Sequence, residues 1–308
     1  MIFKKFTLKI YSIIIYLFKE LSNAFFKYLS KLYQYYFINF KNSGLTYEID
    51  VNRKNKKNIS TFISKQDYNI SKDRYGLPQK LTKYIDKDHN NFPTYTDLIL
   101  FLFKFFNQPI VYLEIGVSVL KNFYLISAGA TNNKLYAFDI NKINPAIEKK
   151  FNKTFEGEQI KIYNFNENSI TYFQGDVFNK NDLFQLENLI SSANFIFSDA
   201  HHSYDGVISE YNNLIKNILE KDFIIYYDDL SKEIKTAFFE IAHDLSKKYK
   251  LNVVTFLING WLGENEKMHR NGIISNLKIN KIFQESKINL LELKYHKKPF
   301  YKIQEKFN

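Results

Sequence analysis

Acidic side chains recur in this sequence at the points where short apolar runs end. These positions are Glu114, Asp139, Asp176, Asp199 and the pair Asp228-Asp229. Carboxylates can accept hydrogen bonds from ribose hydroxyls or amines, and they ligate hard divalent ions. Five such positions after five apolar runs predict a common functional site, since unrelated surface charges would not follow the ends of the runs.

The first three positions have the chemistry needed to hold a nucleoside. Asp139 lies 25 residues beyond Glu114, close to the spacing at which an acidic residue grips ribose hydroxyls. Gly116 permits close approach of a ligand to the backbone. Asp176 is placed to accept a hydrogen bond from an exocyclic amine such as adenine N6, although it could instead cap the helix that follows.

The later positions suit metal binding and proton transfer. Asp199, Asp228 and Asp229 form an all-oxygen set appropriate for a hard divalent ion such as Mg²⁺, and the chain has no cysteine to offer a thiolate. The aspartate pair could instead cap the helix expected from Ser231. His202 lies three residues beyond Asp199 and could take a proton from a hydroxyl.

The remaining histidines are less clearly placed. His201 stands beside His202, so the identity of a base is ambiguous, and either ring could be solvated or buried and hydrogen-bonded. His243 lies within a helical pattern and is expected to be structural. Trp261 and His269 fall in a polar loop that we interpret as a substrate lid.

Strand-like and helix-like segments alternate from about residue 92 onward. The expected strands are Ile110–Ile115, Lys134–Ile140, Ile170–Gln174, Asn194–Ser198, Phe223–Tyr227, Leu251–Ile258 and Gly272–Ile279. The expected helices are Tyr95–Phe106, Val119–Ala130, Pro145–Phe151, Lys180–Ser191, Tyr204–Glu220 and Ser231–Tyr249. This alternation predicts a Rossmann-like α/β fold with a doubly wound, mostly parallel seven-stranded sheet and an antiparallel C-terminal strand. Ligands bind outside the carboxyl ends of such strands, where the acidic residues stand.

The order of these residues resembles a class I S-adenosylmethionine-dependent methyltransferase, over about residues 95–280. Residues 198–207, SDAHHSYDGV, resemble the DGDHSYE-type motif of a branch that methylates hydroxyls of small molecules and sugars. The resemblance implies S-adenosylmethionine as cofactor, Mg²⁺ as a metal, and a small-molecule or glycan hydroxyl as substrate. It assigns cofactor binding to Glu114, Gly116, Ser118, Asp139 and Asp176, metal binding to Asp199, Asp228 and Asp229, and the base to His202 or His201.

The sequence departs from that pattern in ways that keep other functions open. The glycine-rich turn would have Gly at 116, 118 and 120, whereas this chain has Ser118 and Leu120, and His201 replaces an acidic residue. A degenerate fold that binds a ligand without catalysis is therefore one alternative. Nitrogen methylation would favour an Asn/Asp-Pro-Pro-aromatic motif, and the chain has no Pro-Pro. A nicotinamide dehydrogenase would need a fuller G-x-G-x-x-G.

The charge of the chain is concentrated in its first segment. Of the formal net charge of +11, residues 1–60 carry +8, from 11 basic and 3 acidic side chains. Only three residues are Arg, the side chain that reads phosphates and guanine edges, which argues against sequence-specific nucleic-acid binding. The rest of the chain is nearly neutral.

Residues 1–40 combine Lys with Ile, Leu, Phe and Tyr, and their longest uncharged runs are nine residues. A membrane-spanning helix needs about 20 apolar residues. The arm could pack on the main domain or on another subunit of a homo-oligomer, lie on an anionic membrane surface, or act as a signal peptide with a weak cleavage site. We expect a cytoplasmic protein, and membrane association through this arm stays one of the alternatives.

Composition, together with the extent of the resemblance, divides the chain into four parts. Residues 1–60 are a basic, aromatic-rich helical arm and connector, 61–94 a lead-in segment, 95–280 the methyltransferase-like domain, and 281–308 a Lys-rich tail.

Overall fold

The computed structural model describes residues 48, 50–55, 94–118, 120–230, 232–258 and 269–279. The interpretations of the arm at 1–40, of Trp261 in the expected lid and of the tail at 281–308 lie outside the described residues. Among the helices in the described ranges, none is long and apolar enough to cross a membrane.

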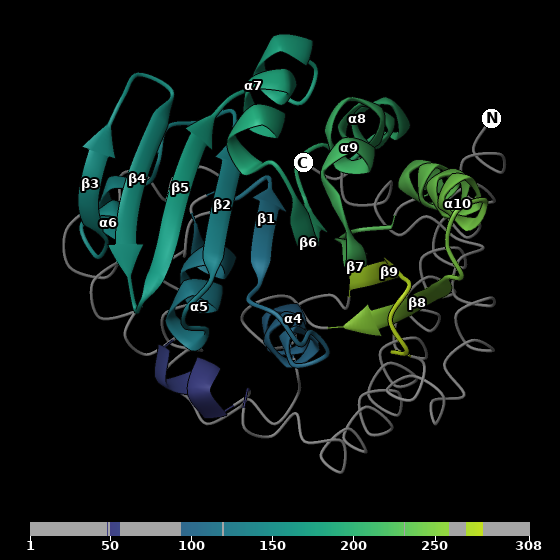
Figure 1. Cartoon of the computed structure of the whole chain (residues 1–308), viewed down its shortest axis with the longest axis horizontal. Helices are drawn as coiled ribbons and strands as arrows, with labels where there is room; N and C mark the ends of the chain where they lie inside the picture. The colour runs from purple at the N-terminus through teal and green to yellow at the C-terminus, as the bar shows by residue number, and fades with distance from the viewer. Residues whose placement is uncertain are drawn as a thin grey trace, which may run out of the picture.

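Within these ranges, a nine-stranded sheet forms the centre of the structure, in the order β3-β4-β5-β2-β1-β6-β7-β9-β8 (Figure 1). The strands are β1 (Val111–Ile115), β2 (Lys134–Asp139), β3 (Asn152–Glu156), β4 (Ile160–Phe165), β5 (Asn168–Gln174), β6 (Ala193–Ser198), β7 (Leu219–Tyr227), β8 (Asn252–Ile258) and β9 (His269–Ser275).

The predicted seven-stranded arrangement is confirmed as the core of this sheet. Strands β5, β2, β1, β6 and β7 pair in parallel, whereas β9 is antiparallel to both β7 and β8. From β1 the chain builds outward through β2 to β5, and then returns to the other side of β1 with β6 and β7. The winding therefore reverses between β1 and β6, and that reversal is where α/β sheets bind ligands.

Two strands were not predicted, and they extend the sheet beyond β5. The helix expected at Pro145–Phe151 ends at Glu148 as α6 (Pro145–Glu148), and the antiparallel hairpin β3–β4 follows it. All five residues of β3 are exposed, so no apolar alternation marks this segment in the sequence. The hairpin is held by lateral pairing of β4 with β5, a long-range interaction that local pattern does not reveal.

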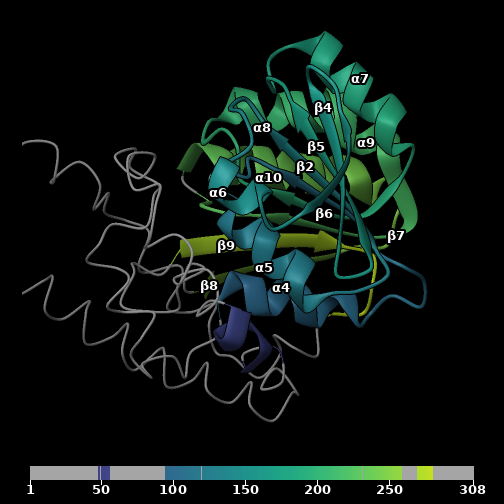
Figure 2. The same ribbon diagram turned by 90° about the vertical axis from the view of Figure 1, so that its left-hand side faces the viewer.

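Helices cover both faces of the sheet. They are α4 (Tyr95–Phe103), α5 (Lys121–Gly129), α6, α7 (Lys180–Ile190), α8 (Tyr204–Glu210), the π-helical turn η3 (Tyr211–Ile215), α9 (Lys216–Ile218) and α10 (Lys232–Ser246). Helices α4 and α5 pack on one face, and α7, η3 and α10 pack on the other (Figure 2). The expected single helix Tyr204–Glu220 is thus continuous from Tyr204 to Ile218 but contains a π-helical turn.

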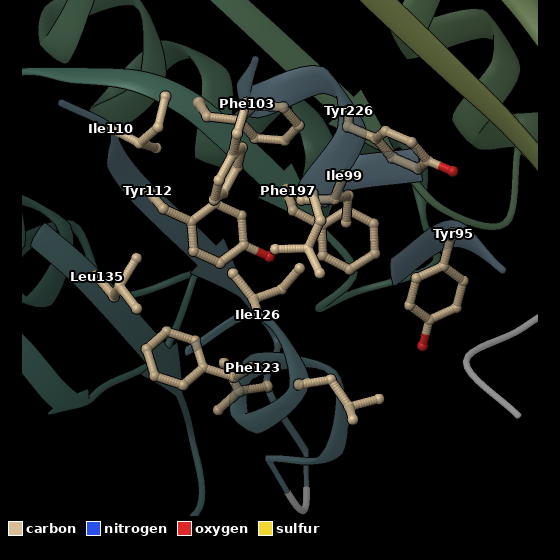
Figure 3. Packing of buried hydrophobic residues seen from close by; sticks show 14 of the residues in the cluster. Tyr95, Ile99, Phe103, Ile110, Tyr112, Phe123, Ile126, Leu135, Phe197 and Tyr226 are labelled. Atoms are coloured by element: carbon tan, nitrogen blue, oxygen red, sulfur yellow. The ribbon is translucent and has the colours of Figure 1, made fainter. Parts of the chain in front are cut away.

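Aromatic side chains fill the face under α4 and α5. The rings of Tyr112 and Phe195, from neighbouring strands β1 and β6, lie against Phe103 of α4 with centroids 5.7 and 5.1 Å away. Phe123 of α5 packs on the other side of Tyr112 at 6.2 Å (Figure 3). A capping box formed by Thr94 and Asp97 begins α4. This packing places both helices, and hence the ends of β1 and β6, in fixed positions.

Candidate functional site

The five parallel strands bring the predicted acidic residues to one edge of the sheet. Ile115, which follows Glu114, is in register with both Phe138 and Ser198, the residues just before Asp139 and Asp199. On either side, Asp139 pairs with Gln174, and Ser198 with Tyr227. The shared edge inferred from sequence is therefore confirmed for the strand ends.

The turn after β1 keeps the shape of a glycine-rich loop without most of its glycines. Gly116, Ser118 and Leu120 have φ angles of 88°, 49° and 64°, in the left-handed region that favours glycine. Ser118 and Leu120 therefore replace the glycines of the expected turn, while the backbone keeps the left-handed angles of a glycine-rich turn. Leu120 is fully buried in the core beneath α4 and α5, so its side chain is directed into the protein.

Gly116 is required by the neighbouring strand end. A Cβ at this position would lie 2.4 Å from the Cα of Ala200 and from the carbonyl oxygen of Asp199. The backbone amide of Asp199 also donates to the Ile115 carbonyl at 2.8 Å. The loop after β1 and the loop after β6 are therefore packed backbone against backbone, and only glycine permits that distance.

Asp139 ties the loops of the first two strands together. Its Oδ2 accepts the Ser118 amide at 2.7 Å, and its Oδ1 accepts the amide and side-chain Nδ2 of Asn141 at 2.8 and 2.9 Å. A carboxylate offers about four acceptor positions, so one on Oδ2 remains for a ligand hydroxyl. The predicted ribose-binding residue thus also fixes the loop beside it.

Glu114 is buried, and its Oε2 accepts hydrogen bonds from the Tyr112 hydroxyl at 2.7 Å and from Asn122 Nδ2 at 2.9 Å. Asn122 in turn accepts from Thr96 of α4 at 2.8 Å. Burial raises the pKa of Glu114 to about 8, so this carboxyl is neutral at neutral pH. The arrangement links β1 to α4 and α5.

Asp176 stands half-buried after β5 and shapes the turn that leads to α7. Its Oδ1 accepts the Phe178 amide at 2.9 Å, and its own amide donates to Asp182 at 2.9 Å. Asn179, rather than Asp176, is the N-cap of α7. The predicted hydrogen bond to an adenine amine would use the Oδ2 of Asp176.

Two large apolar side chains at this edge were missed by the sequence analysis. Ile140, directly after β2, is 61% exposed, and Phe178, after β5, is 49% exposed. Exposed apolar side chains beside polar groups are suited to packing against a flat ring. In the sequence, only their positions shortly after predicted strands could have pointed to these two residues.

The strand ends of β6 and β7 form an acidic cluster around one histidine. The ring of His202 lies between two carboxylates, with Nε2 3.6 Å from Asp199 Oδ1 and Nδ1 3.8 Å from Asp229 Oδ2. Desolvation raises the pKa of Asp199 well above its usual value, and the neighbouring charges of Asp228 and Asp229 raise it further. The charges of Asp228 and Asp229 therefore add to desolvation in making Asp199 harder to ionise.

The two adjacent histidines have different surroundings. His201 Nδ1 lies 2.7 Å from the Ser203 hydroxyl, and its ring meets Phe178 edge-on with centroids 4.9 Å apart. His202 alone contacts the carboxylates, and its side chain is 42% exposed. The geometry therefore distinguishes His202 as the histidine of the acidic cluster.

Asn271 of β9 is a further residue of this cluster that sequence reasoning missed. It is fully buried, and its Nδ2 donates to Asp228 Oδ1. Its Oδ1 has no hydrogen-bond partner, and the hydroxyl of buried Tyr226, near Asp199 and Asp228, has none either. Buried polar groups are normally paired, so unpaired atoms below this edge indicate a place where a ligand or water completes the contacts.

The donor chemistry of the cluster fits a hard divalent ion, because carboxylate oxygens are the preferred ligands of Mg²⁺. A cation would also relieve the repulsion that raises the pKa of Asp199. Within the described ranges, however, no three acidic or histidine side chains converge on a point where they could hold a metal ion. The structure thus gathers Asp199, Asp228 and Asp229 at one edge without forming a metal centre.

A cavity of about 280 Å³ lies at the opposite edge of the sheet. Its walls come from the helical segment at 50–55, from α4 and from the residues preceding β1 and β2, including Val51, Leu100, Ile110 and Asn133. None of the predicted site residues lines it, so the cavity is separate from the acidic edge.

No protein-family model and no curated protein sequence matches the chain. Solved structures with a similar arrangement include the O-methyltransferase TomG from Streptomyces achromogenes, crystallised with S-adenosylmethionine. It shares 10% identity over 59% of this chain and 79% of its own, with a TM-score of 0.40.

Two further similar structures are also methyltransferases. A putative S-adenosylmethionine-dependent methyltransferase from Streptococcus mutans shares 11% identity over 59% of this chain and 47% of its own, with a TM-score of 0.39. The mycinamycin methyltransferase MycE, solved with Mg, S-adenosylhomocysteine and mycinamycin VI, shares 12% identity over 56% of this chain and 47% of its own, with a TM-score of 0.37. This chain spans less than half the length of either. Its fold class is defined by its own strand order.

Proposed function

We propose that this chain is an S-adenosylmethionine-dependent methyltransferase. The observation that carries the proposal is the turn after β1, whose three positive φ angles lie beside Asp139 at the point where the winding of the sheet reverses. Ile140 and Phe178 supply apolar surface for an adenine ring, and Asp139 and Asp176 each retain acceptor capacity. These features fit a nucleoside-bearing cofactor over β2, β1 and β5.

The acceptor is proposed to be a hydroxyl on a small molecule or sugar, bound over β6 and β7. His202 is exposed and can take the hydroxyl proton as the oxygen attacks the cofactor methyl in line. The carboxylates of Asp199 and Asp229 on either side of the ring stabilise the imidazolium that forms.

A divalent ion is a second element of the proposal. Asp199, Asp228 and Asp229 would hold it, and it would lower the pKa of the acceptor hydroxyl and orient it. Because these side chains do not converge as described, they must rotate to bind an ion. Mg²⁺ should then raise the melting temperature of the wild-type protein but not of Asp199→Asn. Chelation should abolish turnover, and full activity after thorough chelation would remove the ion from the proposal.

The test of the main proposal is calorimetry with S-adenosylhomocysteine. We expect a dissociation constant in the micromolar range and a loss of about tenfold or more in affinity for Asp139→Asn. A radiolabelled methyl group from S-adenosylmethionine should then be transferred to members of a panel of sugars and phenols. Absence of binding at about millimolar cofactor would instead favour a fold that has lost this activity and binds another partner.

A further inference from the structure

Glu210 is a buried carboxyl beneath the acidic cluster that has no part in the chemistry proposed above. It is the last residue of α8, directly before the π-helical turn η3, and it is fully buried. Burial raises its pKa to about 8, so it is a neutral acid at neutral pH. A neutral carboxylic acid can donate one hydrogen bond and accept others.

Glu210 is hydrogen-bonded to Ser198, the residue that connects the ends of β6 and β7 below the acidic cluster. Ser198 Oγ donates to Glu210 Oε2 at 2.6 Å. The carbonyl of Ser198 accepts the Asp228 amide at 3.1 Å, and the next residue, Asp199, donates its amide to Ile115 at 2.8 Å. Ser198 is thus the point where β1, β6 and β7 are joined immediately below the cluster.

The second oxygen of Glu210 has a matching group nearby. Glu210 Oε1 and the hydroxyl of Tyr227 are both buried and have no hydrogen-bond partner. Tyr227 is in register with Ser198 and packs in the same apolar layer as η3 and α10, and Glu210 raises its pKa further above the value set by burial. One buried water between the two oxygens would satisfy both.

Two other tyrosines on this side, unlike Tyr227, have hydrogen-bond partners of their own. Tyr211, which follows Glu210, donates its hydroxyl to Asp244 of α10 at 2.8 Å. Tyr204 at the start of α8 donates to Glu240 at 2.5 Å. Glu210 therefore stands apart from these pairs and is directed at the end of β6. π-Helical turns are frequent at functional sites, and η3 follows the residue that makes this contact.

We propose that Glu210 is a positioning residue that acts through Ser198 to hold the end of β6, and with it Asp199 and His202, against β1 and β7. The catalytic purpose of this placement rests on the proposed function. The placement of Asp199 and His202 by Glu210 is independent of it. The contact needs a side chain of this length that can accept a hydrogen bond from Ser198.

Amide hydrogen exchange on the full chain tests the placement without a substrate. In Glu210→Ala and in Ser198→Ala we expect the amides of Asp199 and Asp228 to exchange about tenfold faster, because the hydrogen bond that holds Ser198 is lost. Glu210→Gln should keep wild-type rates within about twofold, since Gln can accept from Ser198 and donate toward Tyr227. Asp244→Asn, on the same helical layer but away from β6, is the matched control.

Two outcomes would overturn the proposal. One is unchanged exchange at Asp199 and Asp228 in both Glu210→Ala and Ser198→Ala. The other is an equal acceleration in β2 and β6, which would indicate general destabilisation. Ser198→Ala removes a single oxygen and keeps the test valid if Glu210→Ala fails to fold.

Methyl transfer provides a separate readout. For Glu210→Ala we expect kcat to fall about tenfold or more while KM for S-adenosylmethionine changes less than about threefold, with Glu210→Gln restoring kcat. A fast local exchange combined with an unaltered kcat would overturn the positioning role. If the wild-type protein transferred no methyl group at all, the proposed function would fail while the exchange result still decided whether Glu210 places Asp199.

Discussion

The two halves of the functional edge use their carboxylates in opposite ways. Over β1, β2 and β5, Asp139 and Asp176 accept backbone amides of the loops that follow these strands at 2.7 to 2.9 Å. Over β6 and β7, Asp199 lies among other carboxylates, and atoms of Asn271 and Tyr226 beneath lack partners. The first half is complete without a ligand, whereas the second is electrostatically unfavourable until a ligand, ion or proton arrives. A preformed cofactor site beside an unfinished reaction site would explain this difference.

Replacing His202 should have the largest effect and would test the second half directly. We expect His202→Gln to lower kcat about 10²- to 10⁴-fold, as loss of a general base does, and to leave the affinity for S-adenosylhomocysteine unchanged. Radiolabelled methyl transfer and calorimetry measure the two quantities. His201→Gln is the matched control and should change kcat less than about threefold; a larger loss there than at His202 would exchange the two roles.

Gly116→Ala tests the packing between the two halves. The added Cβ would lie 2.4 Å from the Ala200 Cα at a φ of 88°, so backbone must move. We expect the free energy of unfolding to fall by about 3 kcal/mol, measured by urea denaturation. Gly157→Ala, at the tip of the β3–β4 hairpin, would meet the ring of Phe155 at 3.1 Å and the Ile160 carbonyl oxygen at 3.2 Å. Shifts of a few tenths of an ångström relieve these contacts, so the variant should cost less than about 1 kcal/mol. Equal losses would contradict a special role for Gly116.

Asp139→Asn tests the half of the functional edge over β1, β2 and β5, where Asp139 holds the loop after β1. The amide side chain cannot accept both the Ser118 amide and the Asn141 groups as a carboxylate does, so the loop after β1 should loosen. We expect affinity for S-adenosylhomocysteine to fall about 10- to 100-fold, corresponding to about 1.5–3 kcal/mol. Asp228→Asn, in the other half, should change this affinity less than about threefold. Similar losses for both variants would mean that the halves do not divide the ligands as proposed.

The pH dependence of stability provides the smallest and most specific test. The pKa of Glu114 is about 8 in the folded protein and about 4.3 when unfolded. The unfolded chain therefore releases this proton first, and stability falls as pH rises from about 4 toward 8. For Glu114→Gln, which can still accept from Tyr112 and Asn122, we expect the decline between pH 7 and 8 to be smaller by about 1 kcal/mol. An unaltered slope would show that Glu114 is not a neutral buried acid.

Local pattern was sufficient for the buried strands and insufficient for the exposed ones. Runs such as Asn194–Ser198 and Phe223–Tyr227 are covered on both faces, so their residues are almost all apolar. Such apolar runs can be recognised as strands from the sequence alone. The hairpin β3–β4 has one strand entirely in solvent and is stabilised by pairing with β5. Its residues therefore carry little information about their own conformation.

The site could be predicted only where residues directly follow parallel strands, because the ends of such strands lie side by side. Position alone placed Asp139, Asp199 and His202 at one edge. Backbone shape was not predictable, because Ser118 and Leu120 adopt left-handed angles that their side chains do not signal. Nor was Asn271, which reaches Asp228 only because β9 returns beside β7.

The position of β9 between β7 and β8 has a consequence for the order of assembly. During synthesis β8 emerges first, yet β7 pairs with β9 and not with β8. The edge of β7 therefore has no strand to pair with until residues 269–275 have left the ribosome. In the finished protein the β7 residues from Phe223 to Tyr227 are buried. We expect this interval to be the stage at which the nascent chain is most exposed to aggregation and most dependent on chaperones.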